Sequence, residues 1–420
     1  MQRSERRMTY DPVLAEREVR KRQGYPWSVL AGLALVLAGS FFLFLREYAY
    51  TGTDLFIHAS IAADFDFSDL HSITSRLAYP LWHLVVSALY QLGMPLGVAA
   101  ALVCALCKGV TFLLAERLVT AMSQGLADRR AVLGLSLLLM IVTAVYVPSV
   151  APNVYRGVGS PNVWHNPTQQ AVTAAMLLVM PWLAHCWYAF KARRDAGESR
   201  VLLPWGQVAV LALLLMGSLA CKPTFMQALL PAAFVMFLVE LMRDRGEWRY
   251  FGQIVLAFLP AVAYFLLQYL YYTGVVVPFT SGVAVGVTWQ SAWMAVRNTL
   301  MMSACPLVAL AACLRKGLFK DRTLVLALLM TLFSVVEAML FQETGLREGH
   351  GNFTWAANSS SLFLWIAMTG VGLRCFAQDR QAGLTLRQKA GYALTVGALA
   401  WHAYAAVYYL YYLLSTQNAF

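Results

Sequence analysis

Aspartate and histidine residues concentrate in one polar stretch near the start of the chain. From Tyr50 to Pro80 the sequence reads YTGTDLFIHASIAADFDFSDLHSITSRLAYP, directly after the first long hydrophobic segment. A carboxylate such as Asp54 can act as a general base, which removes the proton from a hydroxyl group as that group attacks an activated carbon. His58 follows one helical turn later and can share a face with Asp54. We interpret Asp54 and His58 as candidate catalytic residues; the alternative is that Asp54 only caps a surface helix.

The same stretch contains acidic residues that alternate with phenylalanines. Asp64 and Asp66 are separated by Phe65 and followed by Phe67. Carboxylate oxygens are good ligands for divalent cations, so these two aspartates are candidate metal ligands. The alternative is a solvated loop with no metal. The sequence does not decide whether a divalent metal is needed as a cofactor. No metal site other than these two aspartates is predicted.

Basic, histidine and tryptophan side chains fall in connections that we predict on the same side of a membrane. When a phosphate-linked group departs, negative charge builds on its oxygen, and cationic side chains stabilise that charge. Lys222, in the short turn of LACKPTF, has either this role or a snorkelling position at a helix end. The loop tryptophans and histidines either bind substrate or anchor the chain at the membrane interface. The candidates for binding substrate or phosphate are Arg76, Arg156, Trp164, His165, Lys222, Arg347 and His350.

One further charge falls inside a hydrophobic segment. Lys108 lies in the middle of a predicted membrane crossing, where a charged side chain is costly unless it is paired. Glu116 and Glu337 are its predicted partners. We interpret such a pair as structural, because one isolated pair does not form a transport pathway.

The composition places all of these residues in an integral membrane protein. Of the 420 residues, 60% are hydrophobic and 13% are charged, whereas charged residues make up about a quarter of a soluble globular protein. The net charge of +11 arises from clusters between hydrophobic segments, as expected for cytoplasmic loops, so no nucleic-acid partner is predicted. Residues 1–26 form a basic cytoplasmic N-terminus, and residues 27–420 form a single transmembrane helical domain.

The hydrophobic segments predict an all-α polytopic fold with about 11 crossings, because a run of about 20 apolar residues can span a bilayer. The N-terminus is predicted in the cytoplasm, and residues 46–95 form a long first extracytoplasmic loop with surface helices, the last of them at 80–92. A bacterial cytoplasmic (inner) membrane is the predicted location. The predicted crossings are 27–45, 96–121, 131–149, 168–190, 204–220, 226–242, 251–272, 291–313, 323–341, 356–374 and 391–413.

This layout resembles the GT-C superfamily of polytopic membrane glycosyltransferases. The resemblance rests on the first crossing, the long outer loop with its early acidic residue in TDLFIH, and the surface helices that lead through RLAYPLWHL to the second crossing. It implies that Asp54 is the base or the residue beside a metal. It also implies that outer cations hold the phosphate of a polyprenyl-linked donor, roles that fall to Arg156, His165, Lys222 and Arg347. Asp54 is followed by Leu55, so the double-acidic signature of the family is absent.

The function predicted from these observations is transfer of a sugar from a polyprenyl-phosphate-linked donor to a glycan, lipid or cell-envelope acceptor, with inversion. The partners are this donor, the acceptor and membrane lipids. One alternative is a glycan polymerase or ligase that uses a polyprenyl-diphosphate donor, for which Arg347 and His350 carry more weight than Asp54. Another is a lipid or solute transporter, but the sequence shows no internal repeat.

Overall fold

The computed structural model describes residues 26–74, 77–155, 157–198, 200–243, 245–272, 281–314, 317–345 and 351–415. Within these ranges the chain is helical, with 15 α-helices and one pair of short strands. Four predicted site residues, Arg76, Arg156, Arg347 and His350, lie outside the described residues.

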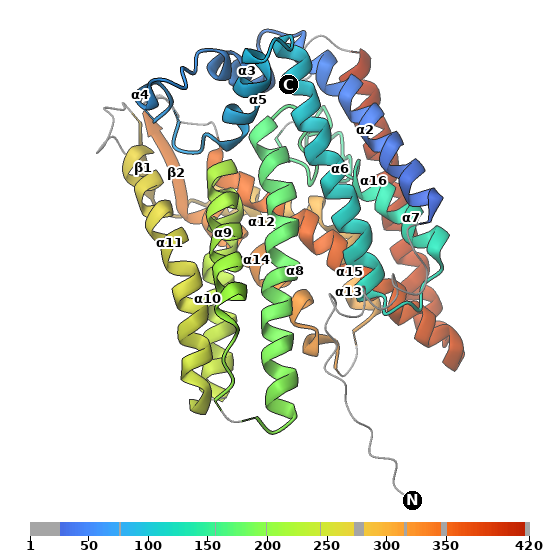
Figure 1. Cartoon of the computed structure of the whole chain (residues 1–420). Helices are drawn as coiled ribbons and strands as arrows, with labels where there is room; N and C mark the ends of the chain where they lie inside the picture. The colour runs from blue at the N-terminus through green and yellow to red at the C-terminus, as the bar shows by residue number, and fades with distance from the viewer. Residues whose placement is uncertain are drawn as a thin grey trace, which may run out of the picture.

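Seven helices in the described part of the chain are long and apolar enough to cross a membrane. They confirm a multi-pass helical membrane protein. They are α2 (Trp27–Tyr48), α6 (Leu96–Met122), α8 (Pro167–Asp195), α10 (Thr224–Arg243), α11 (Trp248–Tyr272), α14 (Arg322–Leu340) and α15 (Trp355–Ala382). Figure 1 shows these helices running roughly side by side, and α6, α8 and α15 are the most buried of the set.

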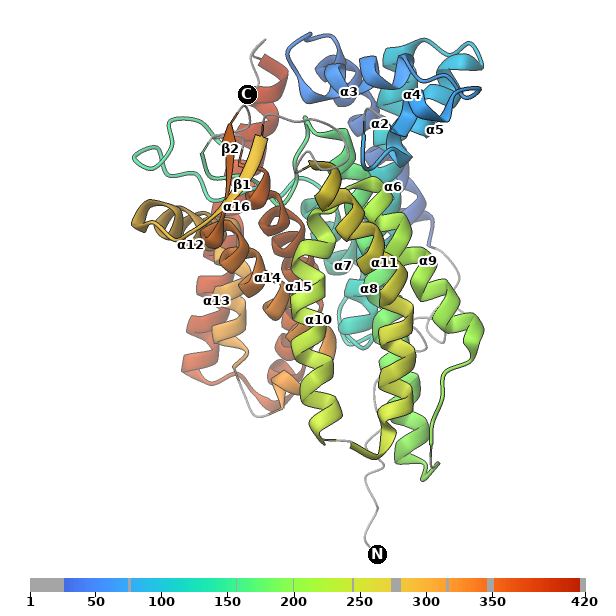
Figure 2. The same ribbon diagram turned by 90° about the vertical axis from the view of Figure 1, so that its left-hand side faces the viewer.

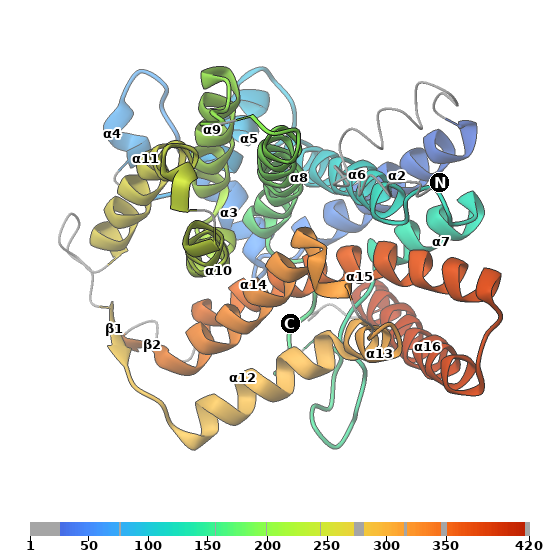
Figure 3. The ribbon, with the colours of Figure 1, turned by 90° about the horizontal axis from the view of Figure 1, so that it is seen from below.

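The predicted number of about 11 crossings is not confirmed. The segment 291–313 forms two helices, α12 (Trp289–Met302) and α13 (Ala304–Ala312), which meet at an angle of 69° and make at most one further crossing. The segment 204–220 forms α9 (Trp205–Cys221), whose 17 residues make it a short apolar helix. The segment 391–413 lies in α16 (Leu386–Ser415), which is long but is not among the seven. Figure 3 shows α12 and α16 at the perimeter of the bundle, with α8 near its middle.

The predicted crossing at 131–149 is wrong as a continuous helix. Only α7 (Arg129–Leu139) is helical, and the chain from Val142 to Val147 has no regular structure. The sequence IVTAVYVP in this region is rich in β-branched residues and ends in a proline, both of which disfavour a helix. Val142 and Thr143 are nevertheless fully buried, so this irregular segment is packed inside the protein.

Short elements gather at one end of the bundle. The surface helices α3 (Asp54–Ala63), α4 (Leu70–Thr74) and α5 (Leu81–Gln91) lie there, as Figures 1 and 2 show. The strands β1 (Ser281–Val285) and β2 (Phe341–Gly345) pair antiparallel at the same end and join two loops in which no strand was predicted. The short helical turn η3 (Asn352–Thr354) precedes α15 there.

The opposite end contains the basic connections. The turns η1 (Arg245–Glu247) and η2 (Leu318–Lys320) lie in two of them. Figure 1 shows the α8–α9 and α10–α11 connections at the end away from α3. Ion pairs hold this end together, among them Arg194 with Glu247 and Arg374 with Asp321. The polar stretch around Asp54 and the basic connections are therefore separated by the length of the bundle.

Candidate functional site

Asp54 is the first residue of α3, and its neighbour caps that helix. The side chain of Thr53 accepts a hydrogen bond of 3.2 Å from the backbone N–H of Phe56, which is the usual role of an N-cap threonine. The reading of Asp54 as a mere helix cap is therefore wrong. Its carboxylate is free to point elsewhere, and 41% of the side chain is exposed.

The carboxylate of Asp54 is held by an asparagine from a distant loop. Nδ2 of Asn166 donates a hydrogen bond of 2.8 Å to Oδ2 of Asp54. Oδ1 of the same asparagine accepts hydrogen bonds from the ammonium of Lys222 at 3.2 Å and from the hydroxyl of Thr168 at 2.8 Å. The backbone N–H of Gln169 is a third donor to this oxygen, at 2.9 Å. Because three donors surround Oδ1, the amide can face Asp54 only with its NH₂ group.

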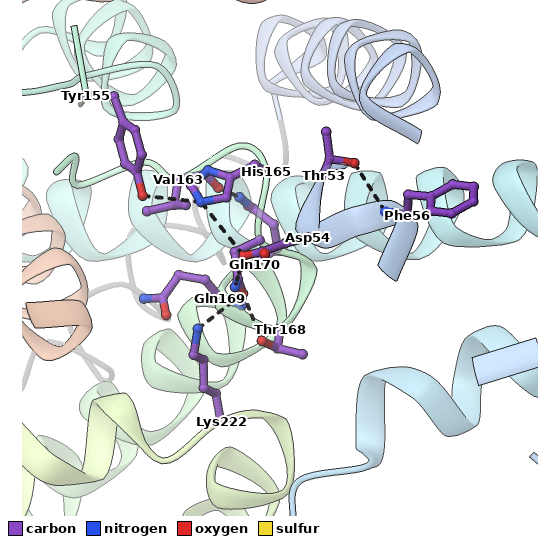
Figure 4. Close-up of polar contacts among 11 residues, drawn as sticks. Thr53, Asp54, Phe56, Tyr155, Val163, His165, Thr168, Gln169, Gln170 and Lys222 are labelled. Atoms are coloured by element: carbon purple, nitrogen blue, oxygen red, sulfur yellow. Dashed lines mark hydrogen bonds and ion pairs between the residues drawn. The ribbon is translucent and has the colours of Figure 1, made fainter. Parts of the chain in front are cut away.

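Asn166 is fixed by the start of a helix. It is the N-cap of α8, and Pro167 occupies the first helical position, where a proline costs no hydrogen bond. The side chain of Asn166 both caps α8 and bonds to Asp54 and Lys222. The fold of α8 therefore also positions the amide between these two residues. Figure 4 shows this arrangement, in which contacts from Asp54 and Lys222 converge on the start of α8.

Lys222 lies in the turn between α9 and α10, as predicted from CKPTF. Its backbone is extended, and only 5% of the residue is exposed. Its ammonium nitrogen lies 3.9 Å from the centre of the Trp355 ring, a cation–π contact in addition to the bond with Asn166. The side chain points into the protein, so the snorkelling interpretation is wrong.

His165 is the third predicted residue that the structure brings to this centre. Its Nε2 lies 3.8 Å from Oδ2 of Asp54 and 3.3 Å from the hydroxyl of Tyr155, with which it shares a hydrogen bond. Tyr155 has φ = 76°, a backbone conformation that a bulky residue adopts only when its surroundings impose it. Tyr155 also stacks on Tyr409 of α16, with ring centres 5.8 Å apart.

Burial sets the charge states around Asp54. It lowers the pKa of Lys222 to about 7, an effect that the Asp54 carboxylate partly opposes. Burial also lowers the pKa of His165 to about 4, against the attraction of Asp54, and the Lys222 cation adds to the lowering. The pKa of Tyr155 is raised, first by burial and then by the charge of Asp54. At neutral pH the histidine and the tyrosine are therefore uncharged, whereas Lys222 is balanced between its two states.

His58 lies on α3 one turn after Asp54 but bonds elsewhere. Its Nδ1 shares a hydrogen bond of 2.8 Å with Nε2 of His83 on α5. Burial lowers the pKa of His58 to about 4, and it lowers that of His83 as well, so this pair is neutral at pH 7. The pair joins the two surface helices. The bond holds α3 against α5, and a direct catalytic role for His58 stays a prediction.

Trp164 precedes His165 but faces a different partner. It is buried, and its ring lies 4.5 Å from the ammonium of Lys108. Lys108 donates a hydrogen bond of 2.5 Å to Oδ1 of Asn162, so its predicted pairing with Glu116 or Glu337 is wrong. The structure therefore does not bring Trp164 to the Asp54 centre. Lys108 instead holds the loop that carries His165 and Asn166.

The aspartates predicted as metal ligands lie in the α3–α4 connection. Oδ1 of Asp66 accepts hydrogen bonds from the backbone N–H and the hydroxyl of Ser68, which lower the pKa of this exposed carboxyl. Asp64 is the C-cap residue of α3. Across the described ranges, no group of three or more histidine, cysteine, aspartate or glutamate side chains is arranged to hold a metal ion.

A cavity of about 130 Å³ lies beside Lys222, on the side of β1 and β2. Its walls come from α10, α11, the two strands and η3, and from Tyr79 in the loop before α5. Lys222 is the residue that the cavity shares with the Asp54 centre. The polar lining residues include Thr224, Gln227, Gln268, Glu343 and Asn352.

No protein-family model matches this chain, and a search of curated proteins finds no matching sequence. The class that the fold defines is a multi-pass helical membrane protein with a polar centre at one end of the bundle. A specific function depends on the residues of that centre.

Sequence reasoning missed Asn166, Tyr155 and Trp355, which connect the predicted residues. Asn166 could have been found, because Asn-Pro directly before a long apolar segment is a helix-start signal that orients the asparagine side chain. The role of Tyr155 depends on an unusual backbone angle. That of Trp355 depends on packing between α10 and α15, and neither has a local sequence signal.

Proposed function

We propose that this chain is a glycosyltransferase of the GT-C type, which moves a sugar from a polyprenyl-phosphate-linked donor to an acceptor hydroxyl on the extracytoplasmic face of the membrane. The single observation that carries the proposal is the bridge from Asp54 through Asn166 to Lys222. It holds a carboxylate and an ammonium group on the two ends of one amide. That pair is what a displacement at an activated sugar carbon needs.

Asp54 takes the role of base. Its Oδ2 is occupied by Asn166, whereas no described residue donates to Oδ1. The carboxylate is also partly exposed, so an acceptor hydroxyl can reach it from outside the bundle. The oriented, unoccupied oxygen supports Oδ1 as the atom that accepts the proton.

Lys222 takes the role of the cation that stabilises the leaving group. Asn166 accepts one of its three ammonium hydrogens, and the Trp355 ring covers another side of the group. The remaining hydrogen can bind a phosphate oxygen. In a site this poorly solvated, one charge–charge contact is much stronger than it is in water.

The reaction is a single displacement. The acceptor oxygen forms a bond to the anomeric carbon of the sugar as its proton passes to Oδ1 of Asp54. The bond from that carbon to the phosphate oxygen breaks, and its electron pair stays on the polyprenyl phosphate, beside Lys222. Attack and departure on opposite faces of the carbon invert its configuration.

The test is transfer by the purified full chain in liposomes, with a panel of polyprenyl-phosphate sugars labelled in the sugar. Expected is release of free polyprenyl phosphate together with label in a glycan or lipid acceptor. A chain that binds these lipids but releases no polyprenyl phosphate from any of them would contradict the proposal. Labelling of Asp54→Cys with an impermeant thiol reagent, compared with the native chain and its seven free cysteines, checks the side of the membrane.

A further inference from the structure

The end of the bundle that contains the basic connections has a cavity of its own. Its volume is about 610 Å³, and it lies between the last turns of α10 and the first turns of α14. Gly317 and two residues of η2 complete the wall. Figure 3, which views the bundle from below, shows α10 beside α14. The length of the bundle separates this cavity from the Asp54 centre, so the two are different sites.

Positive charge exceeds negative charge in the wall of this cavity. Its described charged residues are the cations Arg243, Lys320 and Arg322 and a single carboxylate, Glu240. Asp321 lies between two of the cations in the sequence but is not part of the wall, and its carboxylate pairs with an arginine of α15. Three cations and one carboxylate leave an excess of two positive charges. An anionic group is the ligand that complements this excess.

The three cations are held to different degrees. Arg322 forms an ion pair with Oε1 of Glu240, and its guanidinium lies 5.4 Å from the centre of the Trp187 ring. Arg243 lies 3.8 Å from the same oxygen of Glu240, which is longer than a hydrogen bond, and 62% of its side chain is exposed. Lys320 is exposed, and no described residue forms an ion pair with it. Arg322 is therefore a fixed part of the wall, whereas Arg243 and Lys320 are available to a ligand.

Aliphatic side chains continue the wall toward the middle of the bundle. On α10, Val235 and Val239 precede Arg243 at intervals of four residues, which places all three on one face of the helix. On α14, Val325 and Leu329 follow the arginine that begins the helix, again on one face. These four aliphatic side chains are partly exposed and are not enclosed by the core. At a rise of about 1.5 Å per residue, the apolar wall extends about 12 Å from the charged end.

The two parts of the wall together define the class of ligand. A soluble anion would pair with the cations but leave the aliphatic wall without a partner. A neutral lipid would cover the aliphatic wall but leave the excess charge unpaired. A phospholipid with a net negative headgroup satisfies both parts, because its phosphate lies at the membrane surface and its acyl chains extend into the hydrocarbon. Basic pockets between transmembrane helices are known to bind such headgroups.

We propose that the cavity between α10 and α14 binds one anionic phospholipid. Lys320 and Arg243 contact its phosphate, Arg322 contributes a fixed charge to the same wall, and an acyl chain lies along the valines of the two helices. Arginine and lysine are the side chains that bind phosphate oxygens most strongly. The lipid site is at the opposite end of the bundle from Asp54 and does not depend on sugar transfer.

Native mass spectrometry of the purified full chain in a neutral detergent tests the proposal by counting bound lipids. Dioleoyl-phosphatidylglycerol is compared with dioleoyl-phosphatidylcholine, which has the same chains and no net charge. A cation near the membrane surface is worth about fivefold in affinity for an anionic lipid, so two available cations should give a preference of at least about tenfold for the first phosphatidylglycerol. Glycerophosphoglycerol, the soluble headgroup, should not displace the lipid at the same concentration.

The double substitution Arg243→Gln with Lys320→Gln removes the two available charges and leaves the ion pair between α10 and α14 in place. It should lower the preference for phosphatidylglycerol by about fivefold or more. Arg387→Gln with Lys389→Gln is the matched control. It removes the same charge from exposed residues at the start of α16, which lies at the same end of the bundle but outside the cavity wall, as Figure 2 shows for the helix. The control variant should keep the native preference.

Three results would overturn the proposal. The first is equal affinity of the native chain for the two lipids, or an unchanged preference after Arg243→Gln with Lys320→Gln. The second is displacement of the lipid by glycerophosphoglycerol at equal concentration, which would indicate a site for a soluble anion. The third is an equal loss of preference in the control variant, which would assign the preference to the overall charge of this end of the bundle.

Discussion

Asn166 and Asp54 lie 112 positions apart in the chain, and the amide of the first donates a 2.8 Å hydrogen bond to the carboxylate of the second. Through this bond the start of α8 fixes the direction of a side chain on a surface helix. The same amide accepts from Lys222. One asparagine thus bonds to both the carboxylate on α3 and the amine in the turn before α10.

Substitution of Asn166 tests this bridge. Asn166→Asp keeps an oxygen for the N-cap of α8 but places a second carboxylate against Oδ2 of Asp54, where the NH₂ group stood. Like charges at this distance repel, so Asp54 should turn away, and transfer should fall by about 10²-fold, in the range that a positioned base contributes. The measurement is the single-turnover transfer rate in liposomes.

Asn166→Ser is the matched control for that change. Serine also caps helices well, so α8 should remain intact, with a thermal midpoint close to that of the native chain. Its shorter side chain reaches neither Asp54 nor Lys222, and transfer should still fall. If Asn166→Asp transfers sugar at the native rate, the bridge has no part in the reaction.

The pH dependence of donor binding follows from Lys222. Its pKa, lowered by burial to about 7, means that the ammonium is charged below pH 7 and loses its charge as the pH rises through 7. A phosphodiester donor keeps its charge over this range. Donor affinity should therefore be greatest below pH 7 and fall by up to about tenfold per pH unit above it.

Lys222→Met checks the origin of that profile. Methionine fits a buried position without a charge, so the fold should be as stable as the native one or more stable. Donor affinity should be low and independent of pH between 6 and 9. An unchanged pH profile in this variant would assign the titration to another group.

The capping hydroxyl of Thr53 should help to fix the position of Asp54, because Thr53 is the N-cap and Asp54 is the first residue of α3. Thr53→Ala removes the bond to the N–H of Phe56, which costs about 1 kcal/mol of helix stability. Amide hydrogen exchange at the start of α3 should accelerate, and transfer should decrease because Asp54 is less well held. Thr53→Ser, which retains the hydroxyl, should behave like the native chain.

Packing of α15 against α6 depends on one glycine. A Cβ at Gly370 would lie 2.6 Å from the Cβ of Met122 and 3.1 Å from the carbonyl oxygen of Val119. Gly370→Ala should therefore destabilise the bundle by about 1–3 kcal/mol, as overpacking does. Gly372→Ala, two residues along the same helix, meets no atom within 4 Å and should be neutral or slightly stabilising. Thermal unfolding in detergent compares the two, and equal midpoints would contradict the observed helix contact.

The long helices were predictable because their signal is local. A run of apolar residues bounded by charges predicts α2, α6 and α14 to within a few residues, since length and hydropathy alone decide whether a helix can span a bilayer. The predicted crossing at 131–149 failed because hydropathy there competes with residues that disfavour a helix. Around Val142 to Val147, β-branched residues and a proline stop the helix although the segment is as apolar as a crossing.

The site was predictable in its parts and not in its connections. Asp54, His165 and Lys222 are charged or polar residues in an apolar chain, where such residues are costly and therefore informative. Which loops meet is decided by packing over more than 100 positions, as the Asp54–Asn166 bond shows. No pattern within a single segment contains that information, so Asn166 and Trp355 were not assigned.

The rate of sugar transfer after Asp54→Asn tests the central claim most directly. Asparagine has nearly the same shape as aspartate but takes up no proton, so a single turnover with labelled lipid-linked donor should slow by about 10²- to 10⁴-fold, the contribution of a general base. Asp64→Asn, at the other end of α3, should leave the rate unchanged. Transfer at the native rate by Asp54→Asn would contradict the mechanism.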